Sequence, residues 1–183
     1  MVSQSPRVSR LSFATLALLL AIAPLQAQKQ QREPLNPAQI EKIREAGIYP
    51  SDRIKLYTQF VDERAATIKG LTNRSKSAAR ARRLDDELQD LTALMDELGS
   101  NLDVYSERHA DLRVSLKPLA EASQKWLGIL RALAGEQGFD LARKEAIESG
   151  QDLADQAERL LREQTDYFNL HKDEKGQERA EPK

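Results

Sequence analysis

The sequence predicts an all-α fold, and its composition and apolar spacing carry the prediction. Aromatic residues make up only 5% of the 183 residues and charged residues 31%, a balance that matches helix propensity better than strand propensity. Apolar residues also recur in alternating steps of three and four. They form a heptad seam of Ala81, Leu84, Leu88, Leu91, Met95, Leu98, Leu102, Tyr105, His109, Leu112, Leu116 and Leu119. So narrow a stripe needs opposing helices, which predicts an elongated antiparallel helical bundle built on a long central helix.

The first 27 residues are typical of a secretory signal peptide. Arg7 and Arg10 supply a basic start, residues 11–23 are apolar, and Ala27 ends a suitable cleavage site. A membrane anchor is the alternative, but Pro24 closes the apolar run before the ~20 residues that a spanning helix needs. The sequence therefore predicts an exported protein, periplasmic or extracellular, that begins at Gln28 and keeps no transmembrane helix.

Charge and cysteine content exclude several classes of function. Without the signal peptide the chain has 26 basic and 29 acidic residues, a net charge of −3 that gives no general attraction to nucleic acid. The absence of cysteine excludes disulfides, thiolate zinc sites and cysteine lipidation. We expect a flexible lead over residues 28–35, a helical domain over residues 36–171, and a charged, disordered tail over residues 172–183.

Two helices are predicted before the seam. Asn36 is a suitable N-cap for the first, with Pro37 at the first helical position and Gln39 completing a capping box. Gly47 suits the left-handed exit from that helix. Pro50 marks the start of the second helix, which should end by Asn73.

The seam predicts one central helix over residues 74–134, kinked near Pro118. Its phase passes unchanged through Gly99 and continues beyond Pro118 to Leu133. A proline inside a helix can be accommodated as a kink. The alternative is a chain reversal around residues 113–115, which would give a compact four-helix bundle. Both arrangements remain open from the sequence.

A turn bracketed by Gly135 and Gly138 should precede the last helix. That helix repeats the spacing of three and four, with small residues at Ala146, Gly150 and Ala157. Small side chains would allow a neighbouring helix to approach closely.

No catalytic residue, metal site or cofactor is predicted. A di-metal helical site needs a Glu three residues before each His, whereas His109 and His171 follow Ser106 and Phe168 at that spacing. His109 should instead meet a polar partner on the facing helix. Two-residue spacing sends Glu107, His109 and Asp111 to different helical faces, so they predict no enzyme site. Four carboxylates within six residues should form a solvated helix face: Asp85, Asp86, Glu87 and Asp90.

Five bases in ten residues form the candidate anion-binding site, namely Arg74, Lys76, Arg80, Arg82 and Arg83. Lys76, Arg80 and Arg83 follow steps of four and three, which would place them in one helical stripe. The candidate partners are an anionic phospholipid, a phosphorylated envelope polymer or an acidic protein surface. The alternative is an ordinary solvated face in which Arg83 pairs with Glu87.

The segment Leu35-Asn36-Pro37-Ala38-Gln39 resembles the Leu-Thr-x-x-Gln motif of Spy-type periplasmic chaperones, with Asn36 in place of the threonine. The whole chain is similar to uncharacterised secreted bacterial helical proteins. The Spy resemblance implies a helical cradle that binds unfolded clients, which is the alternative function. The main expectation is a non-catalytic envelope scaffold or binding partner, with homo-oligomerisation left open. Burial of the seams within one chain would favour the scaffold, and an exposed concave apolar face would favour the chaperone.

Overall fold

The computed structural model describes residues 33–171, and every regular element in that range is an α-helix. The helices are α1 (Pro37–Glu45), α2 (Pro50–Thr72), α3 (Ala78–Glu107), α4 (Arg113–Ala132) and α5 (Asp140–Leu170). This confirms the predicted all-α helical bundle. The predicted signal peptide, most of the predicted lead and the predicted tail lie outside the described residues.

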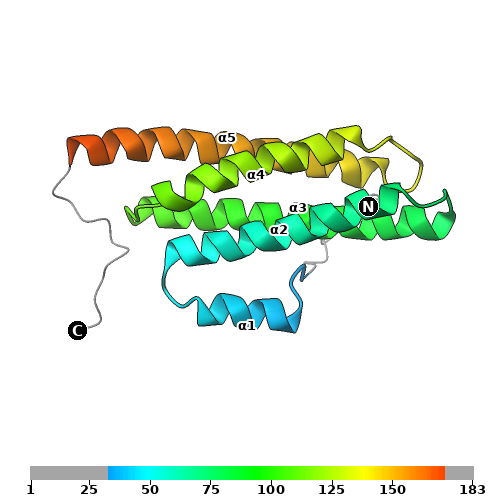
Figure 1. Cartoon of the computed structure of the whole chain (residues 1–183), viewed down its shortest axis with the longest axis horizontal. Coiled ribbons are helices and arrows are strands. Elements are labelled where there is room, and N and C mark those ends of the chain that lie inside the picture. Colours follow the sequence, from blue (N-terminus) through cyan, green and yellow to red (C-terminus); the bar gives the residue numbers. More distant parts are fainter. Residues whose placement is uncertain (1–32, 172–183) are drawn as a thin grey trace, which may run out of the picture. The chain divides into compact units, whose positions relative to one another are not determined.

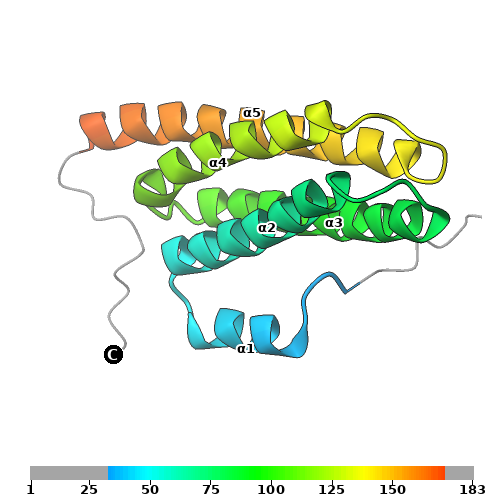
Figure 2. The same cartoon turned by 45° about the vertical axis from the view of Figure 1, so that its right-hand side comes forward.

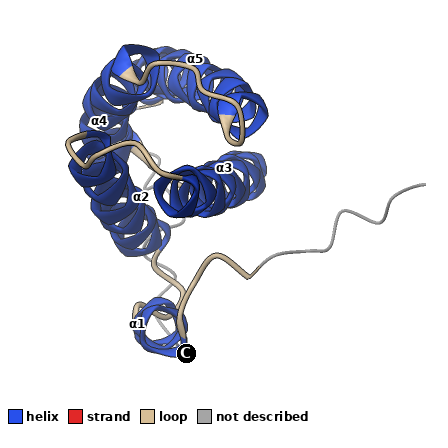
Figure 3. Ribbon diagram, turned by 90° about the vertical axis from the view of Figure 1, so that its right-hand side faces the viewer, coloured by secondary structure: helices blue, strands red, loops and turns tan. Residues whose placement is uncertain are grey.

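Helices α2 to α5 form a four-helix bundle in which successive helices alternate in direction (Figure 1). Both α2 and α5 pack on α3 and on α4. The consecutive helices α3 and α4 lie diagonally across the bundle, as the end-on view in Figure 3 shows. Helix α1 packs against α2 outside the bundle (Figure 2). Among the described helices, none combines the length and apolarity needed to cross a membrane.

Local signals place α1 as the sequence predicts. The Gln39 backbone N–H donates to Asn36 Oδ1 at 3.0 Å, and the Asn36 N–H donates to Gln39 Oε1 at 3.0 Å. Gly47 follows with a φ of 61°, the left-handed conformation that glycine adopts without a steric penalty. Just before α1, the Pro34 carbonyl accepts a 2.7 Å hydrogen bond from Arg64 Nη2. The end of the predicted lead is thereby bonded to α2.

Helix α3 is continuous through Gly99, as the seam predicts. Its seam residues are buried: Leu84, Leu88, Leu91, Met95, Leu98, Leu102 and Tyr105. The predicted close approach of α5 is also confirmed. A Cβ added at Gly150 would lie 3.3 Å from Leu127 Cδ2 on α4, and one added at Gly99 would lie 3.0 Å from Gln156 Oε1 on α5. Small residues therefore set the spacing of these helices.

The prediction of one kinked helix over residues 74–134 is wrong, because the chain reverses over residues 108–112. His109 adopts a left-handed φ of 55° in this turn, a conformation that glycine adopts more readily. Gln164 of α5 then bonds the turn on both sides. Its Oε1 accepts from the Leu112 N–H at 2.8 Å, and its Nε2 donates to the Ala110 carbonyl at 2.9 Å. Pro118 lies inside α4, beyond the reversal.

Candidate functional site

A groove of about 570 Å³ opens where the end of α2, the start of α3 and the second half of α4 meet. Its basic lining side chains are Lys69, Lys76, Arg80 and Lys125, and its one acidic lining residue is Glu136. The other lining residues are Thr72, Asn73, Gly128, Ile129, Ala132, Leu133 and Ala134. We call this set of residues the basic groove. It gathers positive charge from segments that are far apart in the sequence.

Arg80 is the buried centre of the basic groove, with only 8% of its surface exposed. Ser77 caps α3, its side-chain oxygen accepting from the Arg80 backbone N–H at 3.1 Å, and this places Arg80 in the first turn. The guanidinium Nε donates to the Leu71 carbonyl at 3.0 Å, in the last turn of α2. Arg80 therefore bonds a carbonyl near the negative end of the α2 dipole while the other end of its guanidinium reaches the groove.

Glu136 joins the two connecting segments at this end of the bundle. Arg80 Nη1 donates to its two carboxylate oxygens at 3.3 and 3.2 Å, and Lys76 Nζ lies 3.3 Å from Oε1. Burial raises the pKa of Glu136, but the hydrogen bonds from Lys76 and Arg80 outweigh it and hold the pKa below its ordinary value. The carboxylate is thus ionised and bonded to two bases, and the lining keeps a positive surplus.

Lys69 and Lys125 complete the basic rim. Lys125 Nζ lies 3.1 Å from Asp62 Oδ1 on α2, and the same carboxylate oxygen accepts a 2.8 Å hydrogen bond from Trp126 Nε1. Because Trp126 is fully buried, this bond fixes the Asp62 side chain. Asp62 in turn holds the Lys125 ammonium where α2 packs against α4.

One side of the basic groove is apolar. Lys125, Gly128, Ile129 and Ala132 follow helical spacing along one face of α4, where Ile129 is half-buried and Gly128 exposed. A Cβ added at Gly128 would meet no atom within 4 Å. The groove therefore combines an open apolar floor with a basic rim.

The predicted anion-binding residues divide into two groups. Lys76 and Arg80 line the basic groove, whereas Arg83 is exposed and bonds Glu87, its Nε lying 3.1 Å from Oε1. Arg74 and Arg82 are exposed and are not among the lining residues. The predicted helical stripe is wrong because α3 begins only at Ala78, after Lys76. Lys76 and Arg80 are instead brought together by Glu136, with which both form ion pairs.

Sequence reasoning missed Lys69 and Lys125. Neither lies in a basic run, so no local signal marks them. Only the packing of α2 on both α3 and α4 brings them beside Lys76.

The histidines are placed differently from the prediction. His109 is exposed in the turn and stacks on Tyr167, with ring centroids 6.1 Å apart, and His171 stacks on the same ring at 4.3 Å. The prediction of His109 as a seam residue between two helices is therefore wrong, because the residue is exposed in the turn. Asp111 bonds Arg113, which lowers the pKa of the Asp111 carboxyl. Within residues 33–171, no cluster of three His, Asp or Glu side chains could hold a metal ion.

The predicted solvated acidic face is also partly wrong. Arg64 Nη1 lies 2.8 Å from Glu87 Oε2 and 2.9 Å from Asp90 Oδ2, and Glu87 is buried. These two carboxylates join α3 to α2. Asp85 follows the prediction more closely, since it accepts a hydrogen bond from Gln89 on the exposed side of α3.

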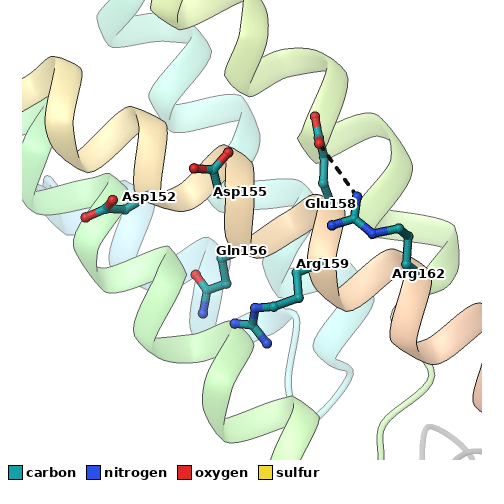
Figure 4. A pocket seen from close by; sticks show the side chains of 6 residues that line it. All are labelled: Asp152, Asp155, Gln156, Glu158, Arg159 and Arg162. Carbon is teal, nitrogen blue, oxygen red and sulfur yellow. Dashed lines mark ion pairs between the residues drawn. The ribbon is translucent and has the colours of Figure 1, made fainter.

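Two further hollows are less suited to binding. The first, on α5, is lined by six polar side chains that follow one another along the helix, with Glu158 and Arg162 already paired at 3.8 Å (Figure 4). The second, about 260 Å³, lies between α1 and the bundle, where Tyr57 donates its hydroxyl proton to Glu97. Burial, together with the Glu97 carboxylate, raises the pKa of Tyr57. The basic groove is larger than either and carries the clearest excess of one charge.

No protein-family model, curated protein sequence or solved structure matches the chain.

Proposed function

We propose that this chain is an exported, non-catalytic helical protein that acts as a binding partner or scaffold in the cell envelope, and that it holds an anionic component in the basic groove. The observation that carries the proposal is the gathering of Lys69, Lys76 and Lys125 around the buried Arg80. Export is inferred from the basic start and apolar run of residues 1–27, which lie outside the described residues.

The ion pairs at the groove leave room for a ligand. Lys76 and Lys125 have side chains that are 75% and 65% exposed, and such surface pairs contribute little to stability. An anion can therefore compete for both ammonium groups without disturbing Arg80. Burial of the seam within this one chain supports a scaffold over a cradle for clients.

Binding of inorganic polyphosphate by the exported protein tests the proposal. The groove variant is Lys69→Gln, Lys76→Gln, Lys125→Gln, and the matched control is Arg74→Gln, Arg82→Gln, Arg83→Gln. Both remove three positive charges, but only the first set lines the groove. At about 1 kcal/mol per base, the groove variant should bind about 100-fold more weakly, and salt should weaken wild-type binding. Equal losses in both variants, or no binding by the wild type, would contradict the proposal.

Client binding of the Spy type is the second candidate, and exposed apolar side chains support it. Five of them belong to the elements that meet at the end of the bundle opposite the basic groove: Ile48, Tyr49, Val104, Val114 and Leu170. Suppression of aggregation of a chemically unfolded client measures this activity. The variant Ile48→Ser, Val114→Ser, Leu170→Ser should lose it, whereas Leu141→Ser, at the other end of the bundle, should not.

Export has its own test. N-terminal sequencing of the exported protein should give Gln28 as the first residue. An intact Met1 in a membrane fraction would favour the anchor.

A further inference from the structure

We infer that the ligand of the basic groove is a single-chain anionic amphiphile, bound as a monomer with its acyl chain on α4 and its carboxylate or phosphate head at the lysines. The inference rests on the proposed function and adds the chemical class of the ligand. Two features of the groove carry it, namely the apolar floor and the uneven distribution of charge around it.

The floor is the feature that a purely hydrophilic anion would not use. Gly128 and Ala132 lie exposed on α4, in the place where a solvent-facing helix normally carries polar side chains, and the half-buried Ile129 packs against the core beside them. Past the end of α4, Ala134 extends the apolar lining beside Leu133, whose side chain is itself buried in the core. Gly128 contributes no side chain and leaves open space above the helix. An acyl chain lying there would remove this surface from water together with its own methylene groups.

The rim supplies the complementary charge. Lys125 lies on the same helical face as the floor, one turn before Ile129, so a chain resting on the floor has its head beside an ammonium group. Lys69 and Lys76 also line the groove. Arg80 and Lys76 share Glu136, and Lys125 pairs with Asp62, so four bases meet two carboxylates. The remaining positive surplus selects an anionic head over a cationic one. A volume of about 570 Å³ is within the usual range of small-molecule sites.

Monomeric binding separates this inference from attraction to a membrane surface. A bilayer presents charged heads to the rim and keeps its acyl chains within its own interior. It therefore does not fill the floor. A monomer in solution gains from rim and floor together, so its affinity should rise with chain length.

Calorimetric titration of the exported protein with dodecanoate and octanoate, below their micellar concentrations, tests the inference. Each added methylene should tighten binding by up to about fourfold, and dodecyltrimethylammonium should not bind. Gly128→Leu places a side chain on the floor and should weaken dodecanoate at least about tenfold while leaving polyphosphate binding intact. Gly70→Leu is the matched control, because Gly70 is also an exposed helical glycine with no atom within 4 Å of an added Cβ.

The outcomes separate the two proposals. If polyphosphate binds but dodecanoate binds no better than octanoate, or if Gly128→Leu leaves dodecanoate unaffected, the amphiphile inference is overturned and the proposed function stands. If anionic vesicles bind while monomeric dodecanoate does not, the ligand is a membrane surface and the inference is again overturned. If the wild type binds none of these anions, both proposals fail. Thermal melting should show that both leucine variants remain folded.

Discussion

At each end of the four-helix bundle, a buried polar side chain bonds main-chain groups where the chain leaves a helix, but the two side chains differ in charge. At the α3–α4 reversal, Gln164 bonds the main chain at Ala110 and Leu112. At the opposite end, Arg80 bonds the Leu71 carbonyl and also Glu136. Gln164 and Arg80 are both buried, and each bonds a carbonyl that lies on a different segment from its own helix.

The difference lies in what remains after these bonds are made. The amide oxygen of Gln164 accepts from one main-chain N–H and its NH2 group donates to one main-chain carbonyl, and none of these groups carries a net charge. Arg80 and Lys76 share Glu136, and Lys125 pairs with Asp62, so the four bases of the groove meet only two carboxylates. Structural needs explain Gln164 completely, whereas four bases beside two carboxylates leave this end of the bundle with a surplus of positive charge. One end of the bundle is thus a connection, and the other carries the basic groove that we propose as a binding site.

Replacing Gln164 by Leu should have the largest effect. The substitution keeps the size of the side chain but makes it apolar, so the Leu112 N–H and the Ala110 carbonyl are left buried without their partner. We expect the free energy of unfolding to fall by about 3 kcal/mol in urea denaturation. Gln156→Leu, which removes a half-buried amide from Gly99 and Asp103, should cost less than about 1 kcal/mol. Similar losses in the two variants would remove the special role of Gln164.

Replacing Arg80 by Met should have the next largest effect. The buried guanidinium bonds to Leu71 and Glu136 are lost, and we expect a fall of about 2 kcal/mol in the free energy of unfolding. Arg83→Met removes an exposed arginine from the buried Glu87, which keeps its ion pair with Arg64, and should cost about 0.5 kcal/mol or less. If both substitutions cost the same, Arg80 would be an ordinary surface base.

The sequence predicts the buried face of α3 but not the reversal between α3 and α4. Periodicity predicts the buried face of α3 because one helix determines its own apolar spacing. It fails at the reversal because Leu112, just before α4, and Leu116 and Leu119 within α4 enter the same core, so the seam keeps its phase across a turn. His109 hides that turn, since it occupies a left-handed position without being Gly or Asn.

The candidate site is predicted only where it is local. Lys76 and Arg80 stand out as part of a basic run, and the structure does place both in the groove. Lys69 and Lys125 depend on how α2 and α4 pack, and the bond from Gln164 depends on how α5 returns past the reversal. Such contacts between distant segments leave no mark in local spacing.

Substitutions of His109 in the left-handed turn should have a smaller effect on stability. Replacing His109 by Gly or by Ala removes the same stacked ring, but only Gly accepts a φ of 55° without a steric penalty. The Gly variant should therefore be the more stable by about 1 kcal/mol. Arg108 is the matched control, because its φ of −86° gives glycine no such advantage. The same order at both positions would show that the turn stores no strain.

The smallest effect concerns Glu136, which is partly exposed to solvent. Because its pKa is lowered in the folded state, its contribution to stability is complete above the pKa of the unfolded chain, about 4.3, and disappears as the pH falls through the folded value. Glu136→Gln removes that contribution. The variant should therefore be less stable than the wild type at pH 7, and the difference should shrink as the pH is lowered below about 4. Denaturation curves at several pH values measure it, with the exposed Glu107→Gln as the control. A difference that stays constant with pH would mean that the bonds from Arg80 and Lys76 do not favour the ionised carboxylate.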